Sequence, residues 1–391
     1  MMAKAYIVDA IRTPGGKRNG ALSQYHPADL GALVLDALVE RTGIPAADLD
    51  DVIFGCVTQS GAQANNVARN SVLASKRIPE SVPAVTVDRQ CGSSQQAMHF
   101  AAQAIMSGTQ DMVIAGGIEM MSVVTIGSNV ADAKAAGHGQ PYASKGIEEN
   151  YGVTWFHQTI GAELIVDQWG LTREEIDEFS YQSHQRAIAA RDRGAFDREI
   201  VPVFSEVLND VLTRDEGIRD ACTVEGLSQL KPISDGAITA GNASQITDGA
   251  SALLIVSETA LKKYNLKPRA VIHTMALAGD DPVKMLTGPI AATHKLLERA
   301  GMSIDDIDLY EVNEAFAPVP LIWLKELNAD PQKLNVNGGG VALGHPLGAT
   351  GTKLVATLIN ELEYRQARYG LVAICESGGT ANATLIERVS A

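Results

Sequence analysis

Short apolar stretches alternate along the chain with longer segments in which apolar residues recur every three or four positions. The stretches 5–10 (AYIVDA) and 51–56 (DVIFGC) have the length and content of buried strands. Segment 93–107 instead carries its apolar residues at helical spacing. Strands that alternate with helices predict an α/β fold in which helices cover mostly parallel sheets.

Part of this pattern occurs twice. Segment 40–50 (ERTGIPAADLD) returns at 298–308 as ERAGMSIDDID, and the same spacing carries 112–117 (MVIAGG) onto 370–375 (GLVAIC). Self-similarity over such a distance predicts two copies of one structural unit. We therefore expect duplicated βαβαβαββ halves.

The last strand of the first copy is delayed by an insertion. Its sequence at 247–257 (TDGASALLIVS) resembles 378–388 (GGTANATLIER), which follows the second copy directly. The intervening residues predict a loop domain that can act as a lid over a ligand. We expect an N-terminal half made of 1–121 with 240–267, an inserted loop domain at 122–239, and a C-terminal half at 268–391.

Composition narrows the class of protein. The 391 residues include 46% hydrophobic and 20% charged residues, which is the balance of a globular enzyme with more than one structural unit. A net charge of −14 argues against a broad nucleic-acid surface. We find no uninterrupted apolar run long enough to span a bilayer, and no ER-retention or peroxisomal signal at the end, so we expect a cytoplasmic protein.

The cysteines are too few for a disulfide framework, and none forms a Cys-x-x-Cys pair, so we expect free thiols and no metal site. Cys91 stands at a turn between a predicted strand and helix 93–107. The positive end of a helix can lower the pKa of a cysteine from about 8.5 into the neutral range and make it a nucleophile. From the residues alone, Cys91 is a nucleophile or a small buried side chain.

A second strand, turn and helix occur at 334–362, where the glycine-rich turn holds His345. The turn lacks both the Gly-Lys-Ser/Thr of a phosphate loop and the glycine spacing of a dinucleotide site, so we exclude both. His345 can act as a base near neutral pH, or it can be a turn histidine that bonds a carbonyl.

The repeat places Cys91 opposite Ala349, so the two turns occupy corresponding positions. Cys375 and Asn313 lie at predicted carboxyl ends of strands, the edge where open α/β sheets bind ligands. We expect these groups to converge with His345 at one edge. The alternatives are a buried strand cysteine at 375 and a solvated strand-end pair at Asn313 and Glu314.

Over essentially its full length the chain resembles the thiolase family. The family's signature blocks stand here as VDRQCGSSQQA around Cys91, TAGNASQITDGA at 239–250, NEAFA at 313–317, NVNGGGVALGHPLGATG around His345 and CESGGT from Cys375. The resemblance implies that Cys91 attacks the keto carbon of a 3-ketoacyl-CoA to give an acyl-enzyme and acetyl-CoA. A second CoA, a co-substrate and not a bound cofactor, then takes the acyl group.

The resemblance also implies the other roles. His345 activates Cys91 and, with a water held by Asn313, stabilises the thioester oxygen, while Cys375 exchanges a proton with the acetyl-CoA carbon. The backbone amides of Cys91 and Ser377 form a second oxyanion hole. This chain departs from the family's C-x-G-G-G-x-G at Ser377 and Ala381, so the amide at 377 survives only if its backbone tolerates a Cβ.

Substrate contacts follow from motif position. Ser244 is expected at the pantetheine, Arg219 at the adenine nucleotide, and Phe316 and Met285 at the acyl pocket. Gln158 stands where acetoacetyl-CoA thiolases have a methionine, which favours a longer or bulkier acyl chain. The stretches GKRNGALS and CVTQSGAQANNVAR are similar to thiolases of bacterial lipid and sterol side-chain breakdown.

Three further expectations concern assembly and alternatives. Segment 63–69 (QANNVAR) lies where family members dimerise, which implies a homodimer or homotetramer, with no nucleic acid or membrane as partner. The nearest alternative activity is an acetoacetyl-CoA thiolase that condenses two acetyl-CoA molecules. The altered CESGGT block leaves a weakly active acyl-CoA-binding protein as a second alternative. A ketoacyl synthase lacks support because its paired histidines are not evident, His345 being the only histidine in the matching C-terminal blocks.

Overall fold

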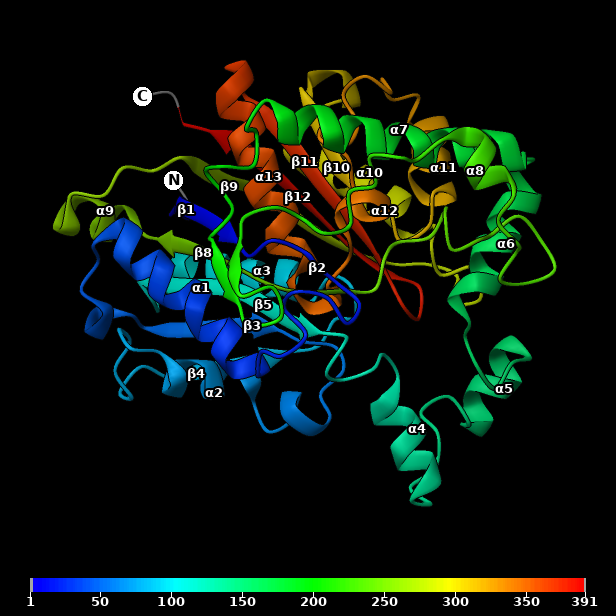
Figure 1. Ribbon diagram of the computed structural model, residues 1–391. Coiled ribbons are helices and arrows are strands. Elements are labelled where there is room, and N and C mark those ends of the chain that lie inside the picture. The colour runs from blue at the N-terminus through cyan, green and yellow to red at the C-terminus, as the bar shows by residue number, and fades with distance from the viewer. Residues whose placement is uncertain (1–2, 390–391) are drawn as a thin grey trace.

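The computed structural model describes residues 3–389 (Figure 1). Its centre is a mixed sheet of parallel and antiparallel strands. The short strand β2 (Gly16–Lys17) lies outside the main strand order and pairs with β8 (Thr247–Val256). The remaining strands lie side by side in the order β10 (Leu309–Val312), β11 (Tyr369–Glu376), β12 (Thr380–Arg388), β9 (Ala270–Gly279), β1 (Tyr6–Arg12), β8 (Thr247–Val256), β5 (Met112–Met120), β3 (Asp51–Gly55) and β4 (Ala84–Val87).

The two halves of this sheet repeat one arrangement. In the first half β3 is parallel to β4 and β5, while β8 is antiparallel to its neighbours β5 and β1. In the second half β10 is parallel to β11, and β12 is antiparallel to β11 and β9. A parallel bridge between Tyr310 and Leu334 stands where β4 stands in the first half. The duplication and the mostly parallel strand direction within each half are confirmed.

Helices lie on both sides of each half. The outer face of the first half is covered by α1 (Pro27–Thr42) and α2 (Val67–Ala74), and that of the second by α10 (Gly288–Ala300) and α11 (Pro318–Leu327). Between the halves lie α3 (Ser93–Ser107) and α13 (Thr350–Arg365), which pack on each other (Figure 1).

The central pair of helices shares one apolar core with both halves of the sheet. Met98 and Leu358 belong to this core together with Ile255 of the first half and Ile374 of the second. Every residue of α13 from Thr350 to Leu362 is buried, as expected of a helix that is covered on all sides. The N-terminal ends of both helices therefore meet inside the protein.

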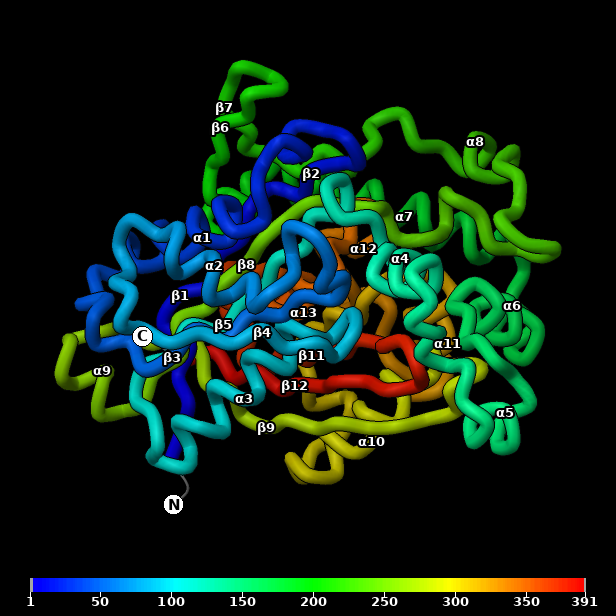
Figure 2. The backbone as a smooth tube through the Cα atoms, turned by 90° about the horizontal axis from the view of Figure 1, so that it is seen from below, coloured from blue at the N-terminus to red at the C-terminus, as the bar shows by residue number. Residues whose placement is uncertain are grey.

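The chain between β5 and β8 adds no strand to the large sheet in the part that the structure describes. Its helices α4 and α5 extend away from the body, and the hairpin of β6 and β7 also projects (Figures 1 and 2). A capping box at Thr172 and Glu175 starts the long helix α7, which packs on α11 and on the short helix α12 (Gly340–Leu343). The elements are α4 (Ser128–Ala135), α5 (Lys145–Tyr151), α6 (Gln158–Trp169), α7 (Arg173–Asp192), β6 (Val203–Ser205), β7 (Asp210–Leu212) and α8 (Val224–Ser228).

Two further helices complete the fold, α9 (Glu258–Tyr264) and the single turn α12 (Gly340–Leu343). Among residues 3–389 no helix combines the length and the apolar character needed to cross a bilayer.

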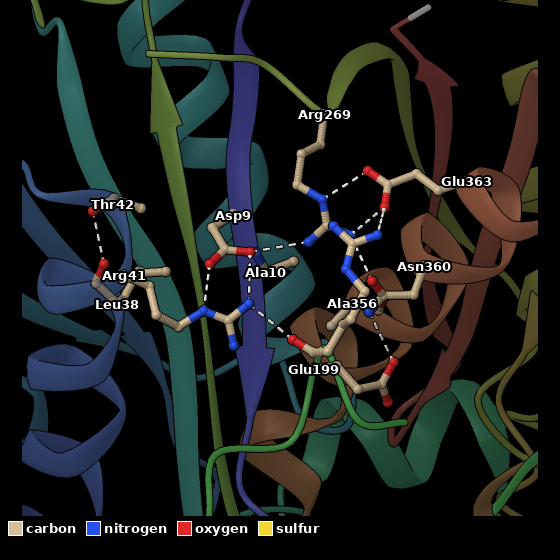
Figure 3. A network of polar contacts seen from close by, with 11 residues as sticks. Asp9, Ala10, Leu38, Arg41, Thr42, Glu199, Arg269, Ala356, Asn360 and Glu363 are labelled. Carbon is tan, nitrogen blue, oxygen red and sulfur yellow. Dashed lines mark hydrogen bonds and ion pairs between the residues drawn. The ribbon is translucent and has the colours of Figure 1, made fainter. Parts of the chain in front are cut away.

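An ionic network supports the junction of the two halves, where β1 pairs with β9 (Figure 3). Asp9 of β1 accepts hydrogen bonds from Arg41 Nε at 2.8 Å and from Arg269 Nη1 at 2.9 Å. Arg269 also donates to both oxygens of Glu363 on α13, at 2.8 and 2.7 Å. The network thus connects α1, β1 and the segment before β9 to the end of α13.

Candidate active site

Cys91 lies in a tight turn between β4 and α3, as the sequence predicts. Gln90 takes a left-handed conformation with φ 48°, and Gly92 is the N-cap of α3. A Cβ at Gly92 would overlap the carboxylate of Glu376, so only glycine fits there without a shift. The Cys91 side chain is 4% exposed and is therefore shielded from solvent by the turn and its neighbours.

The expected lowering of the Cys91 pKa is wrong. Burial raises the pKa of this thiol well above its ordinary value, and Cys375, Glu376 and Glu119 raise it further wherever they are ionised. Desolvation and nearby acidic groups both oppose a thiolate, and here they outweigh the helix end. Cys91 is consequently a neutral thiol that needs a base to take its proton.

His345 is held so that one of its ring nitrogens carries no proton. Its Nδ1 lies 2.6 Å from Thr350 Oγ1, and the same hydroxyl donates to Pro346 O at 2.9 Å. Because the hydroxyl has one proton, Nδ1 donates to Thr350, and Nε2 is left without a proton. Nε2 in turn lies 3.4 Å from the amide nitrogen of Asn313.

The His345 ring is neutral. Burial lowers its pKa to about 3, and the positive charge of Lys353 contributes. A buried imidazole of this kind accepts a proton only when a charge partner appears with it.

Asn313 and Glu314 are both buried, so the alternative of a solvated strand-end pair is wrong. Glu314 accepts hydrogen bonds from Ser183 Oγ at 2.7 Å, Asn335 Nδ2 at 2.9 Å and Val341 N at 3.0 Å. These bonds fix the peptide that carries Asn313. The Asn313 Oδ1 has no hydrogen-bond partner among the described residues and can accept one from a substrate or a water.

Cys375 is buried at the end of β11, followed directly by the buried Glu376. Burial and the Glu376 charge raise the pKa of Cys375 to about 12. Burial raises the pKa of Glu376 to about 8, against the opposing effect of a 2.5 Å hydrogen bond from Thr380 Oγ1. Two thiols and a carboxyl group are therefore all uncharged at neutral pH in one small volume.

The turn after Glu376 accommodates the departure from the family pattern. Its left-handed positions are Gly378 with φ 84° and Gly379 with φ 78°, whereas Ser377 lies outside the left-handed region. A Cβ at Gly379 would come within 2.7 Å of the Asp280 carbonyl oxygen, which makes this glycine the constrained one. A serine at 377 therefore imposes no backbone strain.

The sequence models of two domains match almost the whole chain: "Thiolase, N-terminal domain" at residues 5–259 and "Thiolase, C-terminal domain" at residues 266–388. The chain belongs to the thiolase family. It is accordingly an acyltransferase, as the resemblance of its motifs implies.

Individual relatives agree with this placement. The chain is 52% identical to the steroid 3-ketoacyl-CoA thiolase FadA6 of Mycobacterium tuberculosis, over 100% of this chain and 95% of that protein. It is 43% identical to the 3-ketoacyl-CoA thiolase of Cronobacter sakazakii, over 99% of this chain and 100% of the other. The crystal structure of the Bacillus anthracis acetyl-CoA acetyltransferase superposes with a TM-score of 0.88 at 37% identity, over 99% of each chain.

In this thiolase the expected acyl-pocket residues lie on the Cys375 side of the site. Phe316 and Met285 share a buried apolar cluster with Cys375, and α6, which begins at Gln158, contributes Ile165 to the same cluster. Gln158 itself is half-buried. The cluster thus joins α6 of the chain between β5 and β8 to the strand end at Cys375.

The expected CoA contacts lie on neighbouring loops. Ser244 N donates to Ala315 O at 3.0 Å, beside Phe316, and the adjacent Gln245 donates to Gly217 O at 2.8 Å. Arg219, two residues beyond Gly217, is exposed. The Gln245 bond therefore connects the two loops, while the Arg219 side chain stays at the surface.

Sequence reasoning missed Glu119, which connects the two halves beneath the site. Its buried carboxylate accepts hydrogen bonds from the amides of Val57, Thr58 and Gly348 at 2.9, 3.0 and 2.9 Å. Gly348 belongs to the turn of His345, so one side chain of β5 holds loops from both halves. The available signal was a lone acidic residue near the end of the apolar strand 112–120.

Proposed function

We propose that this thiolase cleaves a 3-ketoacyl-CoA with CoA, giving acetyl-CoA and a shortened acyl-CoA through an acyl-enzyme on Cys91. The observation that carries the proposal is the neutral His345, whose unprotonated Nε2 lies beside Asn313. Its turn is bonded through Gly348 to Glu119, and Glu119 and Cys375 both act on the buried thiol of Cys91. Two thiols and one imidazole are the groups that this two-step acyl transfer requires.

In the first half-reaction, His345 Nε2 takes the proton of Cys91, and the thiolate attacks the 3-keto carbon. The bond between C2 and C3 then breaks, which leaves the acyl group as a thioester on Cys91. The electron pair passes to acetyl-CoA as an enolate, which takes a proton from the Cys375 thiol. The products are acetyl-CoA, a Cys375 thiolate and an imidazolium at His345.

In the second half-reaction, CoA gives its thiol proton to the Cys375 thiolate and attacks the acyl thioester. Cys91 leaves as a thiolate and recovers its proton from His345, so every group returns to its starting state. The raised pKa of Cys375, about 12, supports this role because the thiol donates only to a strong base and regains its proton readily.

Two sets of donors stabilise the charge on oxygen during these steps. The enolate oxygen of acetyl-CoA faces protonated His345 and a water held by Asn313, and the former keto oxygen accepts from the amides of Cys91 and Ser377. The amide at Ser377 is supported by the backbone there, which lies outside the left-handed region. Each such donor typically contributes about 10²–10³-fold to kcat.

Substrate recognition belongs to the chain between β5 and β8 together with residues of the second half. We assign Ser244 to the pantetheine, Arg219 to the adenine nucleotide, and Gln158, Phe316 and Met285 to the acyl pocket. The division into 1–121 with 240–267, 122–239 and 268–391 is part of the same proposal. This division is supported by the sheet topology: among the residues that the structure describes, the chain between β5 and β8 contributes no strand to the large sheet.

A long or bulky acyl chain is the substrate class that we favour. Support comes from Gln158 and from the steroid 3-ketoacyl-CoA thiolase, the most similar relative described above. Condensation of two acetyl-CoA molecules is the second candidate, favoured by the fold match to an acetyl-CoA acetyltransferase. The ratio of kcat/KM for a long-chain 3-ketoacyl-CoA to that for acetoacetyl-CoA decides, and a strong preference for acetoacetyl-CoA would reverse the choice.

We further propose a cytoplasmic homodimer or homotetramer. The supporting observation is exposed apolar surface at the β4 end of the sheet, where Leu73 is 58% and Val85 44% exposed. Exposed apolar side chains at a sheet edge are typical of interfaces. Sedimentation velocity at several concentrations measures the assembly, and a monomer throughout would contradict it.

The direct test of the chemistry is intact-protein mass spectrometry after mixing with a 3-ketoacyl-CoA. We expect one acyl adduct on Cys91, which is discharged by added CoA and is absent from Cys91→Ala. Wild-type protein without an adduct, or an adduct that survives Cys91→Ala, would overturn the proposal. Cys222→Ala is a matched control, because Cys222 is a free thiol outside the proposed site.

A further inference from the structure

Lys353 lies inside the protein on α13, one turn after Thr350, and is 5% exposed. Its Nζ donates hydrogen bonds to Leu343 O at 3.0 Å and to Gly344 O at 2.6 Å. These are the two carbonyl groups that immediately precede His345. One ammonium group therefore holds both peptide planes that lead into the His345 residue.

The lysine keeps its positive charge because acidic groups surround it. Burial and Arg12 lower its pKa to about 8, while Asp215, Glu199 and Glu311 raise it. Arg12 pairs with Glu199 at 2.6 Å and with Asp215 at 2.7 Å, which places both carboxylates in the same cluster.

Glu199 is held in that cluster from α13 as well. It accepts hydrogen bonds from Thr357 Oγ1 at 2.9 Å and from Asn360 Nδ2 at 3.1 Å, the latter residue being part of the network in Figure 3. The lysine thus sits among groups contributed by β1, β10, α13 and the chain between β5 and β8.

A core helix does not need a lysine for stability. The residues after Lys353 on α13, Leu354 and Val355, belong to the apolar core, and an apolar side chain at 353 would avoid the desolvation of an ammonium group. The cost of burying this charge is offset only by the two carbonyl bonds and the acidic cluster. We infer that the buried lysine serves to hold the turn that contains His345.

The turn has little else to fix the carbonyls of Leu343 and Gly344. His345 N is bonded to Gln245 O at 3.2 Å and to Thr247 Oγ1 at 3.1 Å, and the ring is bonded to Thr350. Gly344 is left-handed with φ 79°, and glycine has the largest backbone freedom of any residue. Gly344 N donates to Gly340 O at 3.2 Å, so without the lysine both peptides would be held only through their N–H groups.

We propose that Lys353 is a positioning residue, which fixes the Leu343 and Gly344 peptides and thereby orients the ring of His345, the proposed base for Cys91. The inference rests on the proposed function of His345 as the base. It predicts that Lys353 affects the chemical steps and not the binding of substrates, because its ammonium group touches the turn only through backbone carbonyls.

Lys353→Met removes the donors and keeps an unbranched side chain that is one atom shorter. We expect kcat to fall about 10²-fold, the loss typical of a catalytic group displaced by about 1 Å, with KM for CoA and for the acyl-CoA nearly unchanged. Lys353→Arg keeps a cation with donors and should recover at least a tenth of the wild-type kcat. Lys295→Met is the matched control, since Lys295 Nζ also bonds a carbonyl, Leu277 O at 2.9 Å, but lies at the surface.

The readouts separate positioning from folding and from the proposed function. Circular dichroism and thermal unfolding establish that each variant is folded, and pre-steady-state mass spectrometry follows acylation of Cys91. Folded Lys353→Met that acylates as fast as wild type overturns the positioning role, whereas wild type without a Cys91 adduct overturns the proposed function instead. Where Lys353→Met does not fold, Lys353→Arg decides. A folded Lys353→Arg with reduced kcat and intact KM supports the inference, whereas one with intact kcat and raised KM contradicts it.

Discussion

The amide nitrogen of Asn313 lies 3.4 Å from Nε2 of His345, and the opposite ring nitrogen lies 2.6 Å from the hydroxyl of Thr350. These two contacts determine which nitrogen carries the proton and which is basic. They also bring together the carboxyl end of β10 and the turn before α13, two elements of the second half of the sheet. The proposed base is therefore oriented by its own half before any substrate is bound.

Thr350→Val tests the contact at Nδ1. The variant keeps the shape of the side chain but leaves a buried N–H without its acceptor, which costs about 1–3 kcal/mol and frees the other tautomer. We expect kcat to fall about tenfold or more, with KM little changed. Steady-state kinetics measures both constants.

Thr42→Val is the matched control for that variant, since Thr42 Oγ1 also donates to a carbonyl one turn earlier, Leu38 O at 2.7 Å, but lies far from the site on α1. Equal losses in the two variants would show that the Thr350 effect is a general helix effect. A wild-type kcat in Thr350→Val would contradict the tautomer assignment.

Asn313→Ala tests the other side of the imidazole. The substitution removes the amide that lies beside Nε2 and the buried Oδ1 that we assign to a water. Loss of one oxyanion donor predicts a fall in kcat of about 10²–10³-fold, with the acyl-CoA still bound. Calorimetric titration with an acyl-CoA checks binding, and a large loss of affinity would assign Asn313 to substrate binding instead.

Glu376→Gln tests the charge beside the thiols. Burial raises the pKa of Glu376 to about 8, so the group is neutral below that pH and becomes an anion above it. An anion there raises the pKa of both Cys91 and Cys375. We expect the acylation rate of wild type to fall as the pH rises through about 8, and this fall to be absent from Glu376→Gln.

Stability gives an independent measure of the same group. A folded-state pKa above the unfolded value means that the group's contribution is fully present at low pH and is lost as pH rises toward about 8. Unfolding by urea should therefore show Glu376→Gln gaining stability over wild type with increasing pH. Glu258→Gln, an exposed carboxylate paired with Lys262, is the control, and indistinguishable pH profiles for wild type and Glu376→Gln would refute the prediction.

Gly92→Ala tests the close approach at the N-cap of α3. The added methyl group would overlap the Glu376 carboxylate, so we expect a loss of about 1–3 kcal/mol in stability, as in an overpacked core. Gly146→Ala on α5 is the control, because its nearest atom would be 3.8 Å away. Denaturant titration measures both, and equal stability of the two variants would show that Glu376 moves aside freely.

Much of the fold could be predicted from local sequence. The repeat of 40–50 at 298–308 predicted two equivalent halves, and the alternation of strands and helices predicted their mostly parallel strands. Cys91 was correctly placed in a turn before a helix, because apolar periodicity marks where a strand ends and a helix begins. These features depend on residues that are near one another in the chain.

The sequence by itself thus determined the halves, the two turns and the thiolase motifs that mark Cys91, His345, Asn313 and Cys375. Only the tertiary structure decided their electrostatic state. The Cys91 pKa is raised by burial and then by Cys375, Glu376 and Glu119, and the turn of His345 is held by Lys353, none of which local patterns connect. The physical reason is that desolvation and charge act through space. They depend on which distant segments share a buried volume, and folding alone brings those segments together.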